Sequence, residues 1–362
     1  GIAIGENTYA RTGSLMVGSH NYRGLLGDVT VDSADTKAQG VNINSTTLGT
    51  NSYNGGAFAT ITGAYSIASS NYNGGGFSSS AGKNFGATIM GSLNSIESAT
   101  ASNSSGIANS VVGVANRTFN SNGSLIFGAG NEITNSITTI AAPSSAGDSA
   151  KALQTTLMNS IKSSNSGGST LAIGGGNKAD YTQQSALLGV NNTLTGASDN
   201  ISQYNYITGF KNTGTNVDNV TIIGTNRTVS DAANSVVIGS ADSVMTSSAS
   251  DAVTIGRNAN TTIDGGVALG SNSVASVDKG VDGYNPSTKA LTGSTWTSTV
   301  GSVSVGDAAN DITRKITGVA AGTQDTDAVN VAQLKANKVT LKQGENVTIT
   351  TDVADDGATT YT

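Results

Sequence analysis

A short motif that ends in glycine and recurs along most of the chain is the feature that most limits its fold. In each copy, two to four apolar or β-branched residues precede the glycine, and an asparagine often follows within a few positions. The clearest copies end at Gly5, Gly18, Gly49, Gly63, Gly91, Gly113, Gly128, Gly174, Gly189, Gly209, Gly224, Gly239, Gly256 and Gly270. Most neighbouring copies lie about 15 residues apart, and self-similarity at a fixed period is the signature of a repeat architecture.

A period of this length has room for two short strands and two turns. The segment Val236–Ile238 followed by Val244 illustrates the pattern of one strong strand and a weaker apolar spot half a period later. Glycine and asparagine are expected at the corners because both tolerate positive φ at little cost. Coils stacked at the usual strand spacing pair their backbone groups with the coils above and below. The repeat therefore predicts an all-β solenoid, a parallel β-roll in which each coil contacts mainly its neighbours.

The composition excludes several other classes of protein. Among 362 residues only 12% are charged and 5% aromatic, with 47 glycines, too few large side chains for the compact core of an ordinary enzyme domain. A hydrophobic share of 36% with a net charge of −6 also argues against a disordered chain. With no cysteine and one histidine, His20, we expect no metal and no cofactor. The low pI and the lack of a long apolar run predict no nucleic-acid partner and no membrane insertion by this fragment.

The narrow coils also predict self-association. The interior of a two-faced coil is a slit lined by small apolar residues, and a single slab of this kind leaves one side poorly covered. Cyclic association of identical slabs covers that side and enlarges the core. We therefore expect a homo-oligomer.

The pattern changes after about residue 295. Asp325 or Asp327 is expected to cap a short helix that carries Ala328, Val331 and Leu334 on one face. Such a short, weakly apolar helix needs partner copies to be stable. Residues 338–351 are interpreted as a hairpin that turns near Gly344.

The run ITGVAAGTQDTDAVNVAQL, residues 316–334, resembles the neck signature of YadA-like trimeric autotransporter adhesins, and the glycine–asparagine repeat resembles the head of the same family. The resemblance implies a homotrimer of left-handed parallel β-rolls with coils of about 15 residues, followed by a neck in which the chains exchange positions and by a coiled-coil stalk. It assigns residues 1–295 to the head, with insertions near 19–48 and 129–173. Residues 296–326 form the head end and neck, 327–337 a short coiled-coil helix, and 338–362 the start of a stalk β module.

The resemblance also implies a bacterial cell-surface adhesin, secreted across the inner membrane and anchored in the outer membrane by a C-terminal region missing from this chain. Members of the family bind host receptors, including CEACAM receptors with immunoglobulin-type domains, or matrix proteins such as collagen. Bulky residues in the insertions favour a CEACAM-like receptor; collagen or fibronectin binding, bacterial co-aggregation and a passive spacer role stay open. A polysaccharide-acting β-helix enzyme requires longer coils and clustered carboxylates, so we expect no enzyme activity.

Two insertions and the neck supply the candidate contact residues. The first insertion combines aromatic, basic and leucine side chains that suit a partner surface, although the leucines also fit one more coil strand. Its residues are His20, Tyr22, Arg23, Leu25 and Leu26.

The second insertion places Leu153, Leu157 and Ile161 at helical spacing after Asp148 as the expected cap. Its candidate receptor contacts are Leu153, Leu157 and Met158, unless these only pack the loop onto the roll.

In the neck, inter-chain ion pairs are expected among Arg314, Lys315, Asp325 and Asp327, with Val331 and Leu334 facing the partner chains.

Overall fold

The computed structural model describes residues 1–6, 8, 10, 13–19, 44–70, 84–98, 105–143, 149–285, 289–339, 341–354 and 359–362. The chain forms two compact units. The first comprises Gly1–Asp282 and Ser298–Thr313, and the second comprises Gly283–Thr297 and Arg314–Thr362. Within the described ranges no helix is both long and apolar enough to cross a membrane.

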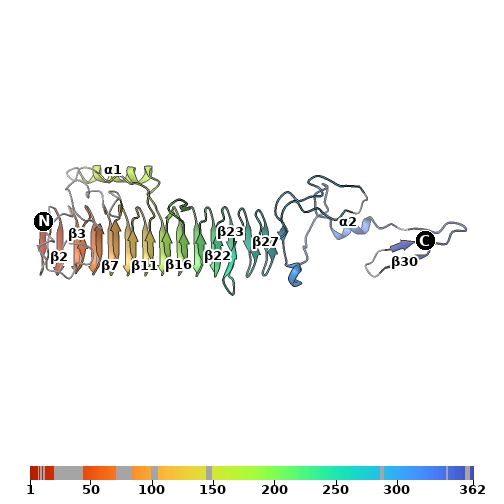
Figure 1. The fold of residues 1–362 in the computed structure, drawn as a ribbon, viewed down its shortest axis with the longest axis horizontal. Coiled ribbons are helices and arrows are strands. Elements are labelled where there is room, and N and C mark those ends of the chain that lie inside the picture. Colours follow the sequence, from red (N-terminus) through yellow and green to blue (C-terminus); the bar gives the residue numbers. More distant parts are fainter. Residues whose placement is uncertain are drawn as a thin grey trace. The chain divides into compact units, whose positions relative to one another are not determined.

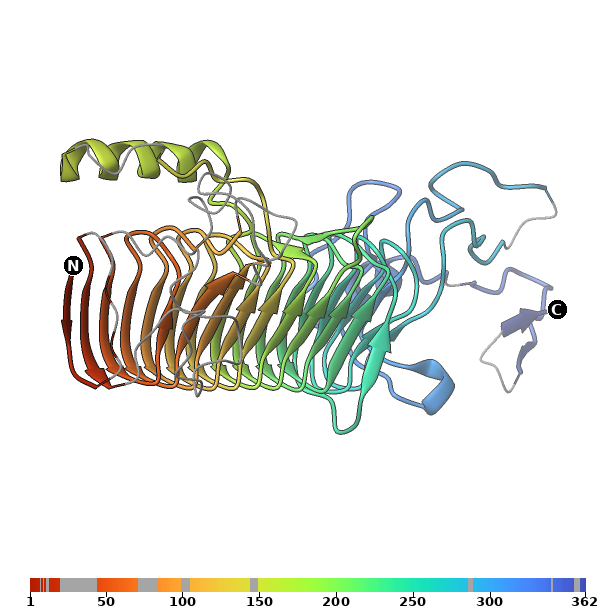
Figure 2. The same ribbon diagram turned by 60° about the vertical axis from the view of Figure 1, so that its left-hand side comes forward.

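The first unit is a stack of coils, as Figures 1 and 2 show, and a 15-stranded sheet, here called the long sheet, runs along it. Its strands are β1 (Ile2–Ile4), β2 (Leu15–Ser19), β3 (Thr46–Thr50), β5 (Thr60–Ala64), β7 (Thr88–Ser92), β9 (Ser110–Val114), β11 (Leu125–Ala129), β13 (Leu171–Gly175), β16 (Ala186–Val190), β19 (Tyr206–Phe210), β21 (Thr221–Thr225), β23 (Val236–Ile238), β25 (Val253–Ile255), β27 (Val267–Leu269) and β29 (Val303–Ser304).

A ten-stranded second sheet forms the other main side of each coil. Its strands are β4 (Tyr53–Asn54), β6 (Ile67–Ser70), β8 (Ser95–Ser98), β10 (Arg117–Phe119), β12 (Glu132–Thr134), β14 (Lys178–Asp180), β17 (Thr193–Thr195), β20 (Thr213–Thr215), β22 (Arg227–Ser230) and β24 (Met245–Ser247). Two short parallel pairs complete the coils: β15 (Thr182–Gln183) with β18 (Ser202–Gln203), and β26 (Asn260–Thr261) with β28 (Val274–Ala275).

The strands of both large sheets pair in parallel and in step, so the predicted parallel solenoid is confirmed. In the long sheet, Gly128 of β11 pairs with Gly113 of β9 on one side and Gly174 of β13 on the other. The second sheet keeps an equivalent register, with Ile133 between Thr118 and Ala179. Every coil therefore repeats the same residue positions at the same height.

The core is one residue thick on each side of the slit. From β2 to β27 the second residue of each long-sheet strand, such as Ile126, Leu187 or Ile222, is buried, and it meets residues such as Ile133 and Leu194 from the second sheet. The alternate residues of these strands face outward, as expected for a period of two. A single layer of this kind buries little apolar surface per coil.

Most of the motif glycines lie inside the strands of the long sheet, and the others directly follow a strand, so the predicted corner position was wrong. Gly128 has φ +142° and is the fourth residue of β11. A Cβ atom there would lie 1.8 Å from the carbonyl oxygen of Gly174 in the next coil. The corners are formed by residues in the left-handed region, many of them asparagines such as Asn135, Asn191 and Asn226.

A ladder of buried asparagines follows the glycines and explains the recurrence of the pair. Asn131, three residues after Gly128, donates from its backbone N–H and from Nδ2 to Oδ1 of Asn116, both at 3.0 Å. The same Nδ2 donates to the carbonyl oxygen of Gly174 at 2.9 Å. The ladder residues, each at most 1% exposed, are Asn94, Asn116, Asn131, Asn177, Asn192 and Asn212. Each one therefore ties three successive coils together.

Arg227 closes this ladder at the position where the next asparagine would stand. Its backbone N–H donates to Oδ1 of Asn212. Its guanidinium donates to three backbone carbonyl oxygens, those of Gly239 at 2.7 Å, Gly256 at 2.8 Å and Ala259 at 2.6 Å. The residue is 2% exposed, and this burial lowers the pKa of Arg227 from its ordinary value.

Three further predictions from the sequence need correction. Val244 is 72% exposed and lies outside the core, just before β24. In the second unit the helix α2 (Val331–Ala336) begins after Asn330, which forms a capping box with Gln333, so neither Asp325 nor Asp327 caps it. The antiparallel hairpin pairs β30 (Thr351–Val353) with β31 (Thr359–Tyr361) rather than strands within residues 338–351. A short 3₁₀ helix, η2 (Ala308–Asn310), follows the last coil in the first unit.

We expect Gly128→Ala to destabilise the roll by about 3 kcal/mol or more, because the new Cβ would collide with backbone and force φ out of its region. Gly130→Ala is the matched control: its φ is +65°, but the nearest heavy atom to a Cβ lies 3.9 Å away. That variant should cost only about 1 kcal/mol. Urea denaturation midpoints at equal protein concentration measure the stability of both variants. Similar losses of stability for Gly128→Ala and Gly130→Ala would contradict the close-approach argument.

We expect Asn131→Asp to lower the free energy of unfolding by about 3–5 kcal/mol at neutral pH, because a buried carboxylate would then face two oxygens, Oδ1 of Asn116 and the Gly174 carbonyl. Burial raises the pKa of such a group, so the loss should shrink as pH falls and the carboxyl takes up a proton. Asn159→Asp on the exposed helix α1 (Ala150–Ser163) is the isosteric control. Denaturation midpoints of both variants at two pH values test this prediction. A loss of unfolding free energy that does not depend on pH would contradict the ladder geometry.

Candidate binding surfaces

The outward side of the long sheet is an apolar stripe along the stack. It is formed by the third residues of the strands, although β5 and β19 carry Thr62 and Thr208 at this position. Eight of these residues are large, apolar and 36–57% exposed, and we call them the long-sheet face: Ile4, Leu48, Met90, Phe127, Ile223, Ile238, Ile255 and Leu269. Because the strands keep one register, these side chains align from coil to coil. Contiguous apolar patches of this extent mark protein–protein interfaces.

The second insertion carries the predicted helix. α1 lies along one side of the N-terminal coils (Figures 1 and 2), and its N-cap is Ser149, whose hydroxyl accepts from the N–H of Ala152; Asp148 lies outside the described residues. Leu157 and Ile161 pack against a satellite core of Ala57, Phe85, Ile107 and Ile140. This contact holds the helix against the roll.

The three candidate contacts on α1 therefore differ in their surroundings. Leu157 is part of the docking contact, Leu153 is half-buried, and Met158 is 42% exposed on the outer side. Leu157 thus packs the loop onto the roll, as the second interpretation of the insertion expects, whereas Met158 takes no part in the satellite core. Whether either residue contacts a receptor stays a prediction.

The first insertion cannot be placed in the same way. His20, Tyr22, Arg23, Leu25 and Leu26 all lie outside the described residues. Their assignment as receptor contacts therefore stays a prediction.

Two bulky residues are exposed at one corner of the coils. Tyr65 (φ +50°) and Leu93 (φ +61°) occupy the same corner of consecutive coils, and they are 49% and 58% exposed. A bulky side chain in the left-handed region costs about 1–2 kcal/mol, and neither side chain is buried in return. The motif glycine two positions earlier locates this corner, but it does not indicate that a bulky residue adopts positive φ there. Strain of this kind at exposed positions points to contact sites.

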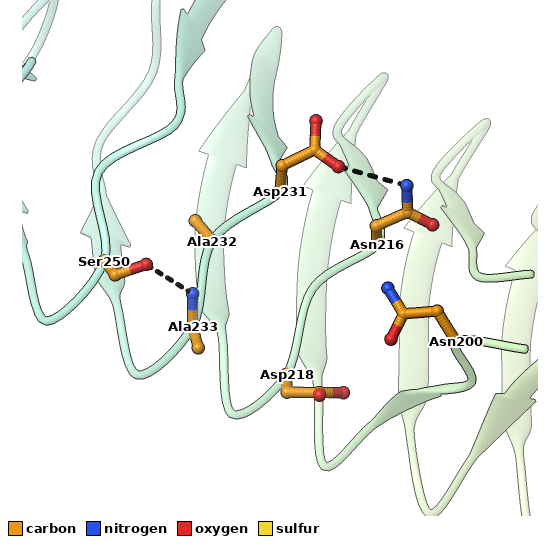
Figure 3. A pocket seen from close by; sticks show the side chains of 7 residues that line it. All are labelled: Asn200, Asn216, Asp218, Asp231, Ala232, Ala233 and Ser250. Atoms are coloured by element: carbon orange, nitrogen blue, oxygen red, sulfur yellow. Dashed lines mark hydrogen bonds between the residues drawn. The ribbon is translucent and has the colours of Figure 1, made fainter.

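A shallow polar cleft of about 310 Å³ lies at a different corner of the later coils (Figure 3). Most of its polar side chains already have partners: Asp231 accepts from Nδ2 of Asn216 at 3.1 Å, and Asp218 accepts from the backbone N–H of Gln203 at 2.7 Å. Ser250 accepts from the N–H of Ala233. Across the described ranges, no group of three or more His, Cys, Asp or Glu residues is placed to hold a metal ion. The cleft therefore links neighbouring coils through its own hydrogen bonds.

The carboxylates that lie close together on the second sheet are held in ion pairs. Arg117 forms a two-pronged contact with Glu97 and a further one with Glu132 at 2.8 Å. Hydrogen bonds from the guanidinium to Glu97 raise the pKa of Arg117 above its ordinary value, with a smaller contribution from Glu132. These groups connect three coils and are not arranged as an acid and base across a substrate groove.

The neck residues are exposed in the single chain. Val331 and Leu334 on α2 are 65% and 68% exposed, and the side chains of Arg314 and Lys315 also face outward. Asp327 accepts hydrogen bonds from the N–H groups of Gln324 and Thr323, which lower the pKa of this carboxyl. Its role in the single chain is thus to fix a turn before α2. The inter-chain ion pairs of Arg314, Lys315, Asp325 and Asp327 stay a prediction.

Comparison with known proteins finds one family model and two relatives that match parts of the chain. Residues 315–356 match the family described as the coiled stalk of trimeric autotransporter adhesin. The chain is 50% identical over 91 residues to the autotransporter adhesin BadA of Bartonella henselae, which is 24% of this chain and 3% of that protein. It is 63% identical over 49 residues to the trimeric autotransporter adhesin AtaA of Acinetobacter sp. (strain Tol 5), which is 13% of this chain and 1% of that protein. The chain thus spans only a few per cent of the length of these relatives, and the matches confirm the resemblance predicted from residues 316–334.

We expect Leu157→Ala or Ile161→Ala to weaken the docking of α1 by about 1–2 kcal/mol each, because half-buried apolar contacts with the satellite core are lost. Hydrogen exchange in residues 150–163 should then become several-fold faster, with exchange in the long sheet unchanged. Met158→Ala, on the exposed side of the same helix, is the control. Equal acceleration by all three variants would contradict the assigned docking face.

Proposed function

We propose that this chain, which resembles the YadA-like trimeric autotransporter adhesins, is the head, neck and first stalk module of a trimeric bacterial surface adhesin. The observation that carries the proposal is the long-sheet face, because an apolar stripe along an entire stack of coils needs a cover that one chain does not supply. The match of residues 315–356 to the stalk family and the similarity to two autotransporter adhesins support the same conclusion.

Three copies around a common axis would bury the apolar surfaces that the single chain leaves exposed on the long sheet and on α2. The long-sheet faces would meet near the axis and form the thick core that each slit lacks. On α2, Val331 and Leu334 would meet their copies in a short coiled coil, and the stalk would continue from there. By this proposal the adhesin stands on the bacterial cell surface, anchored in the outer membrane.

The function we propose is binding without chemistry. A rigid rod presents its corners and insertions to a target, and three copies of each contact add avidity through effective concentration. On α1 the contact residues would be Met158 and Leu153, with Leu157 positioning the helix. In the first insertion they would be His20, Tyr22, Arg23, Leu25 and Leu26.

A host protein receptor is the partner that this surface favours. Its candidate contacts are apolar and aromatic side chains spaced out on a polar, weakly charged roll, which suits protein–protein contacts that depend on a few anchors. An immunoglobulin-type receptor of the CEACAM family is the first candidate, because the insertions carry bulky residues that a plain roll does not need. Collagen or fibronectin binding and bacterial co-aggregation are the alternative outcomes of the same test.

The test begins with the mass of the purified chain in solution, where we expect three times the chain mass of 35.9 kDa. The trimer is then titrated against immobilised CEACAM ectodomains, collagen and fibronectin. Alanine variants of Tyr22 and Leu26 test the first insertion, and those of Leu153 and Met158 test the second. The variants of at least one insertion should bind the receptor at least tenfold more weakly. The control is Lys178→Ala on the second sheet, which should bind like the parent.

The outcomes separate the parts of the proposal. A monomer would rule out the trimeric head. A trimer that binds none of the three targets would leave the spacer role, and unchanged affinity for all four alanine variants would remove both insertions as contact sites.

A further inference from the structure

A hollow of about 470 Å³ lies at the edge of the long sheet where β13, β16 and β19 begin. Its floor is Ala186, which pairs in register between Leu171 of β13 and Tyr206 of β19. Because alanine is much smaller than its two neighbours, the surface drops between them. Tyr204 and Tyr206 are 58% and 42% exposed and form a wall on one side. The hollow is thus an apolar socket with aromatic edges.

The opposite ends of the same strands carry projections instead. β16 ends in Val190 and β19 ends in Phe210, which are 44% and 40% exposed. Lys211 follows, with its Nζ 5.1 Å from the centroid of the Phe210 ring. The preceding strand, β13, ends in Gly175 and projects no side chain. Socket and projections therefore occupy the two ends of the same strands, at the same level of the stack.

Two polar atoms at this level are buried without a hydrogen-bond partner among the described residues. They are Oε1 of Gln184, which lines the hollow, and Oγ1 of Thr208, at the centre of β19. An unsatisfied buried acceptor or hydroxyl costs about 1–3 kcal/mol, and such atoms in native structures nearly always find a partner. Both atoms lie at the level of the hollow, and other groups of the same chain cover them.

We propose that Phe210 and Val190 of one copy insert into the hollow at Ala186 of the next copy, so that the three chains close as a head-to-tail ring; this rests on the proposed homotrimer. The long-sheet strands all run the same way, so a ring with parallel stacks places the end of each strand beside the start of the same strand in the neighbour. Such a contact is heterologous, and it closes after three copies. The ammonium of Lys211, which lies beside the Phe210 ring, then borders the same seam.

The chain has no cysteine, so paired cysteines report this contact directly. The double variant Ala186→Cys with Val190→Cys, treated with a short bismaleimide, should give a covalently closed trimer on a denaturing gel. Either single variant should stay monomeric on that gel, because a head-to-tail seam needs both thiols. The matched control pairs Ala186→Cys with Thr195→Cys, at the end of β17 on the second sheet, and should give no covalent trimer.

A second variant tests the projection itself. Phe210→Ala should raise the concentration at which half of the trimer dissociates by at least tenfold, while circular dichroism of the coils stays unchanged. Tyr181→Ala, at a corner far along the coil from Phe210, should leave that concentration as in the parent.

The proposed homotrimer and the proposed seam can fail separately. A monomeric parent chain would overturn both. A trimeric parent whose Ala186/Val190 double variant gives no covalent trimer, or whose single variants give covalent dimers, would overturn the seam and leave the trimer in place. Unchanged dissociation of the Phe210→Ala variant would also count against the seam.

Discussion

The close approach of glycines in successive coils is the constraint on which the rest of the first unit depends. At Gly128 there is no room for a Cβ beside the Gly174 carbonyl, and that carbonyl receives its hydrogen bond from a side chain, Nδ2 of Asn131. The glycine thus creates an acceptor that the asparagine three residues later satisfies. Because the amide of each asparagine also binds the previous asparagine, the heights of three coils are fixed by one side chain. A buried polar network that is fully satisfied specifies one arrangement better than a thin apolar layer does.

Arg227 shows how the stack continues where the ladder of asparagines ends. Each ladder asparagine donates to one glycine carbonyl ahead, as Asn212 does to that of Gly224. The longer guanidinium reaches the carbonyls of Gly239, Gly256 and Ala259 from one position. Burying this charge is tolerable because its donors face carbonyl oxygens on successive coils. The register therefore continues into β25 although the ladder of asparagines has ended.

Most of the fold of the first unit could be predicted from the sequence repeat. The spacing of the glycines gives the coil length and the strand pairing, and the alternation within each strand gives the core residues. The prediction that the glycines form the corners was wrong. It rested on the tolerance of glycine for positive φ, and the sequence does not show that the backbone of the next coil leaves no room for a Cβ atom. The cap of α2 was misplaced for a similar reason: Asp325, Asp327 and Asn330 are all acceptable caps by type. The choice among them depends on Gln333, which holds Gly322 through both its amide atoms. For the binding surfaces, the helix in the second insertion was predictable from its spacing, whereas the hollow at Ala186 arises from three residues in different coils.

The internal ladder also explains why recognition can be placed at the corners. The corner that precedes the long sheet has the same left-handed conformation in many coils, yet it holds Gly123, Ala108, Phe58 or Tyr204. The backbone there is fixed by hydrogen bonds to adjacent coils, such as that from the N–H of Tyr204 to the Gln183 carbonyl. A side chain at this corner can therefore change from none to an aromatic ring without altering the coil. The cost is local strain of about 1–2 kcal/mol for each bulky residue, which a stack tied together from inside can absorb. We expect a bulky residue at such a corner where a contact outside the coil offsets this strain. Tyr65, Leu93 and Tyr204 are therefore the corner residues at which a partner is expected to bind.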